Sequence, residues 1–313
     1  MTKEIKIFFL RQMQWGKPTF NSYTPGDWGD ESSRWKDMVS VEDFRDADYL
    51  VVFNTPTVDL MRFFPPEKIF YFKGEPEEFE FSRHMWDNVD SKSHIYPRPV
   101  NHWHSKKSYS WFKSHDFPEK TKDLSWVTTN AGDGSAREQG LQVLPNQKRR
   151  MDFLIHFLKK YPNNLHLFGR GLNNYIKYQN FVFNHGQLSN KWDGVKDFRY
   201  TISFESSIQS GHFTGKLIDG ILAGCMPIYY GCSDLENYIP KDSFLRVDLK
   251  KDLDSVCDEV IEIIKSDLRE QHLDAIREAK ELLLDKWNIW NIIYEEIKKY
   301  HNSSAIKSPS NGY

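Results

Sequence analysis

Residues 199–231 read RYTISFESSIQSGHFTGKLIDGILAGCMPIYYG. The apolar run RYTISFE at the start is typical of a buried strand, and MPIYYG at the end is typical of a second one. Between them, a polar loop leads into the helix-forming run LIDGILAG. This alternation of strand, helix and strand predicts an α/β protein with mainly parallel sheets.

The polar loop after the first of these strands suits an anion. A helix that starts there presents unbonded backbone N–H groups, and its dipole adds partial positive charge. Lys216 lies in the first helical turn, where a cation is unfavourable for the helix itself. A bound phosphate would explain the lysine, so we expect an anion site at this helix start.

The same alternation extends along the chain in both directions. We expect strands at 4–10, 47–54, 68–74, 93–97, 124–130, 164–171, 200–205, 226–231 and 243–249, and helices at 147–160, 190–198, 214–224, 251–266 and 268–299. A polar stretch, SHDFPEKTKD, separates two sets of strands. With 313 residues, the chain therefore predicts two domains, 1–118 and 119–300, and a flexible tail at 301–313. The last helix is long enough to return to the first domain.

Bulk composition describes an ordinary globular protein. Apolar residues make up 39% and charged residues 27%, and the net charge of −2 gives no field for nucleic acid. We therefore expect no nucleic-acid partner and a small anionic ligand. Three cysteines without a C-x-x-C pair indicate a reducing, cytoplasmic location. The short apolar run IFFL near the N-terminus predicts neither a signal segment nor integral membrane contact.

The segment from Arg199 to Asp248 resembles the donor-binding signature of the alpha-1,3-fucosyltransferases, glycosyltransferase family 10. That signature has a Phe-Glu start, an aromatic-x-Thr-Glu-Lys centre, a helix of small residues and a strand that ends in Gly. Upstream, LSWVTTN, NQKRRMDFLIHFL and LHLFGRG also resemble the family, and IFYFKGEPEEF at 69–79 is a short match. The resemblance implies two Rossmann-like domains facing a cleft, the GT-B type, with the acceptor on the first and the nucleotide sugar on the second.

Carried over position by position, the resemblance assigns two cations, Arg150 and Lys216, to the diphosphate of a GDP-sugar. Fixed cations and a helix start can neutralise a leaving diphosphate without an essential metal or other cofactor. The remaining assignments come from the strand end and the loop. The predicted donor-binding residues are Arg150, Glu205, Ser206, His212, Phe213, Thr214 and Lys216.

Other interpretations stay open for the two cations. Lys216 has the alternative of a solvated helix lysine. Arg149 and Lys148 compete with Arg150, although the helical spacing to Phe153 favours Arg150.

The loop positions also have alternatives. Glu205 follows the strand, where it either orients a ligand hydroxyl or caps local backbone N–H groups. Ser206 stands where the family has a short amide. His212 stands where the family has an aromatic residue that contacts the nucleotide, and its alternative is an exposed loop position.

Glu75 is the predicted catalytic base, because the resemblance places it after an aromatic strand that ends in Gly-Glu. The neighbouring Glu77, Glu78 and Glu80 make a solvated acidic loop the alternative. The implied reaction is an inverting transfer of L-fucose from GDP-fucose to a glycan hydroxyl, with the base accepting the hydroxyl proton.

One departure from the family pattern leaves the donor sugar open. The family's Thr-Glu-Lys is Thr-Gly-Lys here, with Gly215 in place of the carboxylate. The alternatives are another nucleotide sugar in the same fold and a non-catalytic module that binds a nucleotide or a glycan.

Three further motifs are given structural interpretations. Asp46-Ala47-Asp48 imitates a metal-binding D-x-D motif but precedes an apolar strand, which favours a turn. His102-Trp103-His104 lacks a carboxylate or cysteine partner for a metal. GDGS at 132–135 is predicted to be a loop.

Overall fold

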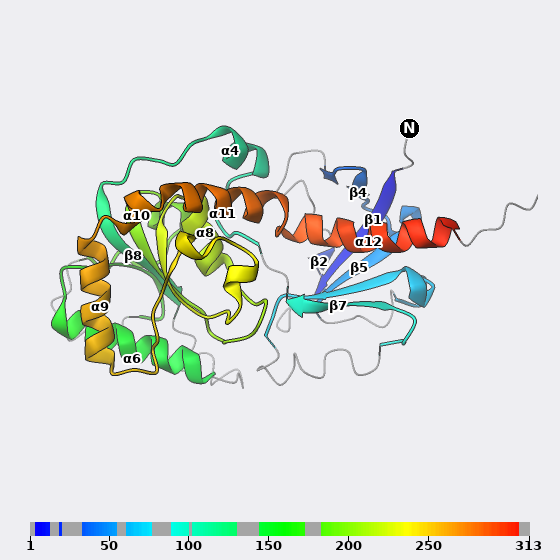
Figure 1. Ribbon diagram of the computed structural model, residues 1–313. Coiled ribbons are helices and arrows are strands. Elements are labelled where there is room, and N and C mark those ends of the chain that lie inside the picture. Colours follow the sequence, from blue (N-terminus) through cyan, green and yellow to red (C-terminus); the bar gives the residue numbers. More distant parts are fainter. Residues whose placement is uncertain are drawn as a thin grey trace, which may run out of the picture. The chain divides into compact units, whose positions relative to one another are not determined.

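The computed structural model describes residues 4–12, 19–20, 33–54, 61–76, 89–99, 102–129, 144–172 and 183–306 (Figure 1). The chain divides into two compact units. Unit 1 comprises residues 1–100, 108–111 and 285–313, and unit 2 comprises residues 101–107 and 112–284. These bounds differ from the expected 1–118 and 119–300 because the segment 101–107 belongs to unit 2 and the chain re-enters unit 1 at Asp285. The GDGS segment lies outside the described residues.

Unit 1 contains a mainly parallel sheet. Its described strands are β1 (Ile5–Gln12), β2 (Thr19–Phe20), β3 (Arg34–Trp35), β4 (Met38–Ser40), β5 (Tyr49–Asn54), β6 (Ile69–Lys73) and β7 (His94–Pro99). They are ordered β3-β4-β1-β5-β6-β7, with β2 paired to β1. β2 and β3 pair antiparallel with their neighbours, and the other pairs are parallel. β5 and β6 are buried along their whole length, as expected of strands that are apolar on both faces.

The last helix, α12 (Ile289–Ile306), packs within unit 1. Ile289, Ile293 and Ile297 recur every fourth residue and share a core with strand residues such as Phe9 and Val51. This spacing places the three isoleucines on one helical face. Figure 1 shows α12 beside β1 and β5. The helix continues past residue 301, the expected start of a tail, and residues 307–313 lie outside the described residues.

The expectation of one continuous helix over 268–299 is wrong. The structure has α10 (Leu268–Gln271), α11 (Leu273–Asp285) and α12 in its place. Asn288 explains the last break, because its side-chain oxygen accepts a hydrogen bond from Asn291 N at 2.8 Å. Such a cap starts a new helix rather than continuing the old one.

Unit 2 contains a sheet whose described strands all run parallel. The strands are β8 (Lys122–Thr129), β9 (His166–Arg170), β10 (Phe198–Phe204), β11 (Met226–Tyr230) and β12 (Leu245–Arg246). Its other helices are α6 (Pro145–Lys160), α8 (Gly215–Leu222) and α9 (Leu253–Lys265), while α4 (Tyr109–Ser114) lies where the chain passes between units. These two sheets confirm the predicted α/β class with mainly parallel strands in both halves of the chain.

Two local expectations for the chain meet different outcomes. The predicted helix at 190–198 is wrong, because only a 3-10 turn at Lys191–Gly194 forms and β10 begins at Phe198. Asn190 caps that turn by accepting from Trp192 N. The turn expected around Asp48 is present, and its carboxylate accepts a hydrogen bond from Lys6 N at 3.0 Å.

The strand order of unit 2 locates a natural binding position. The sheet runs β12-β11-β10-β8-β9, so the chain proceeds outward in opposite directions on the two sides of β8. The switch point lies between β8 and β10. In open parallel sheets, ligands bind at the carboxyl ends of the strands at such a point.

The structure also describes the state of the cysteines and the character of the helices. Cys225, Cys232 and Cys257 are buried free thiols. In the described part of the chain, no helix combines the length and apolar character that crossing a membrane requires.

Candidate anion-binding site

Arg150 links the carboxyl ends of β8 and β10. It projects from α6 and donates hydrogen bonds to Ser206 Oγ at 2.9 Å and to Thr128 Oγ1. Thr128 is the penultimate residue of β8, and Ser206 follows the end of β10. The guanidinium therefore lies at the switch point of the sheet.

Arg150 forms no direct ion pair with a carboxylate in the described part of the chain, and the charge of Glu205 acts on it only without contact. The residue is 3% exposed, and its Nε has no hydrogen-bond acceptor there. Burial lowers the pKa of Arg150 to about 10, so the group still carries its proton at neutral pH. A buried cation without a direct ion pair is costly, by several kcal/mol even after relaxation, and a bound anion would offset that cost.

The two competing cations on α6 point elsewhere. Arg149 donates to the carbonyl of Leu249 at 3.2 Å, and Lys148 pairs on the surface with Asp152 at 2.7 Å. Because successive residues of a helix face different directions, only one of the three reaches the strand ends. The structure places Arg150 there.

Glu205 organises the loop that follows β10. Its carboxylate is fully buried and accepts hydrogen bonds from Thr214 N at 2.8 Å and Lys216 Nζ at 3.1 Å. Burial alone would raise the pKa of Glu205, but the Lys216 charge and the Thr214 hydrogen bonds hold it below its usual value. Glu205 is therefore an internal carboxylate that closes the loop and positions the lysine.

The side chain of Lys216 is partly exposed in this arrangement. Its side chain is 26% exposed, and Nζ donates to Glu205 and to Thr214 Oγ1. An ammonium has three N–H groups, so one donor remains for a ligand. Burial lowers the pKa of Lys216 and the charge of Arg150 acts in the same direction, against the opposing effect of Glu205.

Thr214 defines the start of α8. It is the N-cap residue, and its Oγ1 accepts a hydrogen bond from Lys216 N at 3.2 Å. The predicted helix start thus exists, with the lysine in its first turn.

His212 and Phe213 are more buried than a solvent-exposed loop would allow. They are 3% and 7% exposed, and the Phe213 ring packs edge-on against Tyr238 at 5.2 Å. The charge of His212 acts on the carboxylate of Glu205. The structure thus excludes an exposed loop position for His212, and contact of either residue with a nucleotide stays a prediction.

Four residues at this site were not predicted from the sequence: His104, Thr128, Lys191 and Asp219. Asp219 is fully buried and pairs with Lys191 at 2.8 Å. Its other oxygen accepts from the backbone N of His104 at 2.9 Å. Thr128 could have been found as the polar end of a buried strand. The others carry no local signal because the fold brings them together from distant segments.

Glu75 lies in unit 1, just beyond the end of β6. It is half-buried, and its neighbour Gly74 donates its N–H to Asn54 Oδ1 at 2.8 Å. Asn54 ends β5, so the two strand ends are joined at this point. Its role as the base stays a prediction, and Glu77, Glu78 and Glu80 lie outside the described residues.

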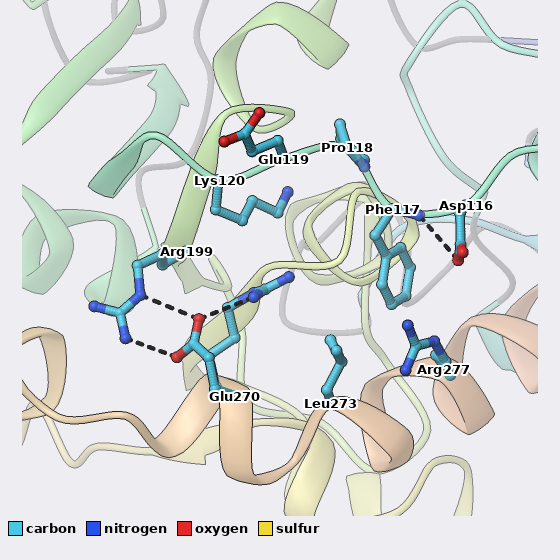
Figure 2. Close-up of a pocket in the computed structure, with 10 residues that line it drawn as sticks. Asp116, Phe117, Pro118, Glu119, Lys120, Arg199, Glu270, Leu273 and Arg277 are labelled. Carbon is cyan, nitrogen blue, oxygen red and sulfur yellow. Dashed lines mark hydrogen bonds and ion pairs between the residues drawn. The ribbon is translucent and has the colours of Figure 1, made fainter.

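Unit 2 also contains a cavity lined by charged residues, away from the residues of the anion site. It measures about 330 Å³ (Figure 2) and is lined by Asp116, Phe117, Pro118, Glu119, Lys120, Arg199, Arg269, Glu270, Leu273 and Arg277. Lys120 Nζ donates to the carbonyl of Ala223 at 2.6 Å, and Arg269 Nε donates to that of Gly224 at 2.8 Å. These carbonyls end α8, where cations are favourable.

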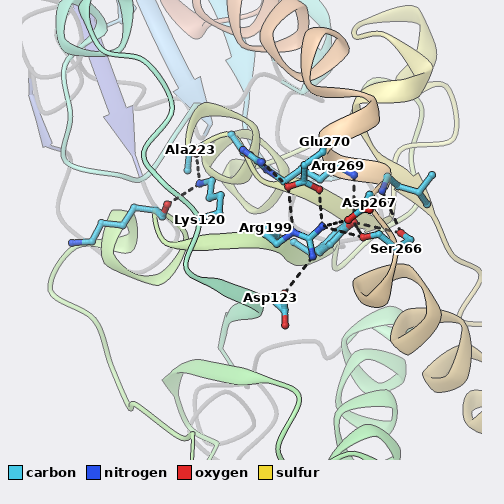
Figure 3. Close-up of polar contacts among 12 residues, drawn as sticks. Lys120, Asp123, Arg199, Ala223, Ser266, Asp267, Arg269 and Glu270 are labelled. Carbon is cyan, nitrogen blue, oxygen red and sulfur yellow. Dashed lines mark hydrogen bonds and ion pairs between the residues drawn. The ribbon is translucent and has the colours of Figure 1, made fainter.

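The same cavity contains an arginine–carboxylate network. Arg199 donates to Glu270 at 2.7 Å and to Asp267 at 3.2 Å, and it also pairs with Asp123 (Figure 3). The network joins the start of β10 to α10. Because these cations already have internal partners, we interpret the cavity as part of the fold.

The described residues offer no cluster of metal ligands. Among the residues described, no three His, Cys, Asp or Glu side chains gather in a way that could hold a metal. Independence from metal stays a prediction.

Comparison with known proteins gives a family match in unit 2. The family described as "Glycosyltransferase family 10 (fucosyltransferase) C-term" matches residues 117–272. The chain is 27% identical over 135 residues to 4-galactosyl-N-acetylglucosaminide 3-alpha-L-fucosyltransferase 9 of Cricetulus griseus and of Homo sapiens, and 29% identical to that of Bos taurus. These alignments cover 42% of this chain and only 31% of each relative's length.

Solved structures show a weaker likeness. Two crystal structures of an alpha-1,3-fucosyltransferase, without ligand and with GDP-fucose, share 16% identity with this chain at a TM-score of 0.49. They match 96% and 100% of this chain, over 90% and 94% of their own. A sucrose-phosphate synthase from Thermosynechococcus elongatus has a TM-score of 0.47 and 10% identity, over 83% of this chain and 69% of its own.

Proposed function

The chain carries the C-terminal domain of glycosyltransferase family 10 over residues 117–272, and from this premise we propose that the protein moves L-fucose from GDP-fucose to a hydroxyl of a glycan acceptor. One observation carries the proposal: Arg150 is a buried cation without a direct ion pair among the described residues, located at the switch point of a parallel sheet. A diphosphate supplies the missing negative charge. The names of the similar fucosyltransferases support L-fucose as the sugar.

The proposed chemistry is a single displacement with inversion. The acceptor oxygen bonds to the anomeric carbon as the bond from that carbon to the diphosphate oxygen breaks. The electron pair leaves with GDP, whose growing charge is stabilised by Arg150, Lys216 and the N-terminus of α8. Glu205 contributes by holding Lys216 in place at 3.1 Å.

The acceptor proton requires a base, and we assign that role to Glu75. Its position beyond the end of a buried parallel strand is a common one for functional side chains. A carboxylate there takes the hydroxyl proton as the new bond forms.

A different GDP-sugar is the second candidate donor. Gly215 is the reason to consider it. The position lacks the carboxylate of the family pattern, and a neighbouring imidazole lies against it, as described below. Turnover with a panel of GDP-sugars and UDP-sugars identifies the donor.

Arg150→Met separates a ligand-binding arginine from a structural one. Removing a buried charge that has no direct ion pair should leave the free energy of unfolding unchanged or raise it. GDP binding, measured by calorimetry in the presence of a chelator, should weaken about 10- to 100-fold because a charge-assisted contact is lost. Arg149→Met is the matched control on the next position of α6, and it should bind GDP like the parent protein.

Two results would contradict the proposal. Equal losses of GDP affinity in both arginine variants would mean that Arg150 does not contact the nucleotide. GDP binding without turnover of any donor would indicate a nucleotide-binding protein rather than a transferase.

A further inference from the structure

His104 lies directly against Gly215 at the start of α8. A Cβ atom placed on Gly215 would lie 2.9 Å from His104 Nδ1, closer than real Cβ atoms come to their neighbours, and 3.0 Å from His104 Cγ and 3.1 Å from Asp219 Oδ2, which are tight contacts. Only glycine at this position leaves room for the ring. The segment 101–107, which belongs to unit 2, thus contributes a side chain beside the anion site.

A buried carboxylate holds the backbone of this segment in place. Asp219 Oδ1 accepts hydrogen bonds from the N–H groups of His104 and Ser105, both at 2.9 Å. Asp219 lies one helical turn after Gly215 and is itself paired with Lys191. Trp103 is buried and donates to the carbonyl of Lys107 at 2.9 Å, which closes the segment on itself. The imidazole therefore has a fixed place over the helix start.

Desolvation, more than the neighbouring charges, favours the neutral form of His104. Desolvation lowers the pKa of His104 to about 4, and the positive charges of Lys191 and Lys216 act in the same direction, against Asp219 and Glu205. The ring of His102 lies beside it, at 5.2 Å between centroids. His104 nevertheless has accessible surface, so it offers a neutral N–H at the edge of a cationic site.

We propose that His104 is a ligand-binding residue of this site and donates an imidazole N–H to the diphosphate of the bound nucleotide. The inference rests on the proposed function, because it requires a nucleotide diphosphate at Arg150 and Lys216. A neutral donor adds a hydrogen bond to the anion without a third positive charge to repel the two cations. Gly215 serves this arrangement by admitting the ring.

The first test compares GDP affinity in His104→Ala and His104→Gln. Loss of a hydrogen bond to a charged acceptor should weaken binding roughly 10- to 100-fold in the alanine variant. His156→Ala is the control, because His156 lies on α6 and pairs with Asp254 at 3.0 Å. It should leave GDP affinity unchanged. Thermal unfolding of every variant verifies that each one folds, and the glutamine variant keeps a polar side chain if alanine loosens the segment.

The second test uses the contact between the two positions. Gly215→Ala should displace the imidazole and weaken GDP binding to the level of His104→Ala. The double variant should bind no more weakly than His104→Ala alone, because the clash has been removed. It should also melt at a higher temperature than His104→Ala, since alanine favours a helix over glycine.

The outcomes distinguish this inference from the function on which it rests. GDP binding that is unaffected in His104→Ala and His104→Gln overturns the role of His104 and leaves the proposed function standing. Additive losses in the double variant also overturn it, because they would mean independent effects. A parent protein that binds no GDP contradicts both proposals.

Discussion

Lys216 pairs with Glu205 inside the protein and is also proposed to bind the diphosphate. Its removal should therefore affect both folding and nucleotide binding. The ammonium contacts the buried Glu205 carboxylate while 26% of the side chain stays exposed. A lysine that only stabilised the fold would need no exposed surface at a strand end. A lysine that only bound phosphate would need no buried carboxylate.

Lys216→Ala should therefore weaken both GDP binding and folding. GDP affinity should fall about 10- to 100-fold with loss of a charge-assisted contact. The free energy of unfolding should fall by about 1 to 3 kcal/mol, less than for a fully buried pair, because Glu205 loses its cation. Calorimetric titration and urea unfolding measure the two effects.

A second substitution separates the two roles of Lys216. Glu205→Gln in the Lys216→Ala background removes the unpaired charge, so it should recover part of the stability and none of the GDP affinity. Full recovery of affinity would show that the lysine acts only by holding the loop.

Glu75→Gln tests the base and leaves the size of the side chain unchanged. Transfer should fall by about 100- to 10,000-fold, while GDP affinity stays the same because the proposed nucleotide-binding residues belong to unit 2. Glu67→Gln is the control, since Glu67 is an exposed residue just before β6. If the Glu75→Gln variant stayed active, the base would be another residue. Glu77, Glu78 and Glu80 would then be substituted next.

α8 is stabilised at both ends by groups from other segments. Its start is capped by Thr214 and tied to Glu205, and its end adopts a Schellman motif in which Cys225 N donates to Gly220 O at 2.9 Å. Gly224 has a φ of +77° in that motif, and its missing Cβ leaves room for Phe117. These anchors fix the direction of the helix N-terminus toward the switch point.

The arginine network below α8 predicts a change in acid stability. Hydrogen bonding to Arg199 lowers the pKa of Glu270 to about 2, from 4.5. The carboxylate thus stabilises the fold above about pH 4.5, and this contribution is lost as the pH falls toward 2. Because the side chain is 43% exposed, we expect about 1 kcal/mol. Glu270→Gln should lower stability at pH 7 and make the acid-induced decline shallower over that pH interval, measured by urea unfolding. An unchanged pH profile would mean that the pair contributes nothing.

At the scale of the whole molecule, the residues that we propose to bind the nucleotide belong to one of the two units. Arg150, Glu205, Thr214 and Lys216 all belong to unit 2, whereas Glu75 belongs to unit 1. A ligand that binds the folded state stabilises the part that holds it.

GDP should therefore slow amide hydrogen exchange mainly in unit 2. We expect protection at the ends of β8 and β10 and through the first turn of α8, with the sheet of unit 1 exchanging as before. Hydrogen exchange with mass spectrometry measures this on the full chain. Protection confined to unit 1 would place the nucleotide elsewhere.

The periodicity of the sequence was sufficient to predict the main strands and the fold class. Buried parallel strands such as β5 and β10 are continuous apolar runs, and that signal depends only on local residues. The helix start at Thr214 was equally readable, since a cap is defined by its own neighbours. The helix expected over 268–299 failed because apolar spacing does not show where a side chain such as Asn288 interrupts it.

The site depended on contacts that no local pattern contains. Arg150 could be chosen from Lys148, Arg149 and Arg150 only weakly by spacing, and the structure distinguishes them by what each one touches. His104 lies 111 residues before Gly215 in the chain, and the motif His102-Trp103-His104 gives no sign of this contact, yet the ring fits the space that the glycine leaves. Local sequence determines the strands and the caps because those interactions join near neighbours. The buried charge of Arg150 and the contact between His104 and Gly215 exist only after the chain has folded, because burial and proximity are properties of the tertiary structure.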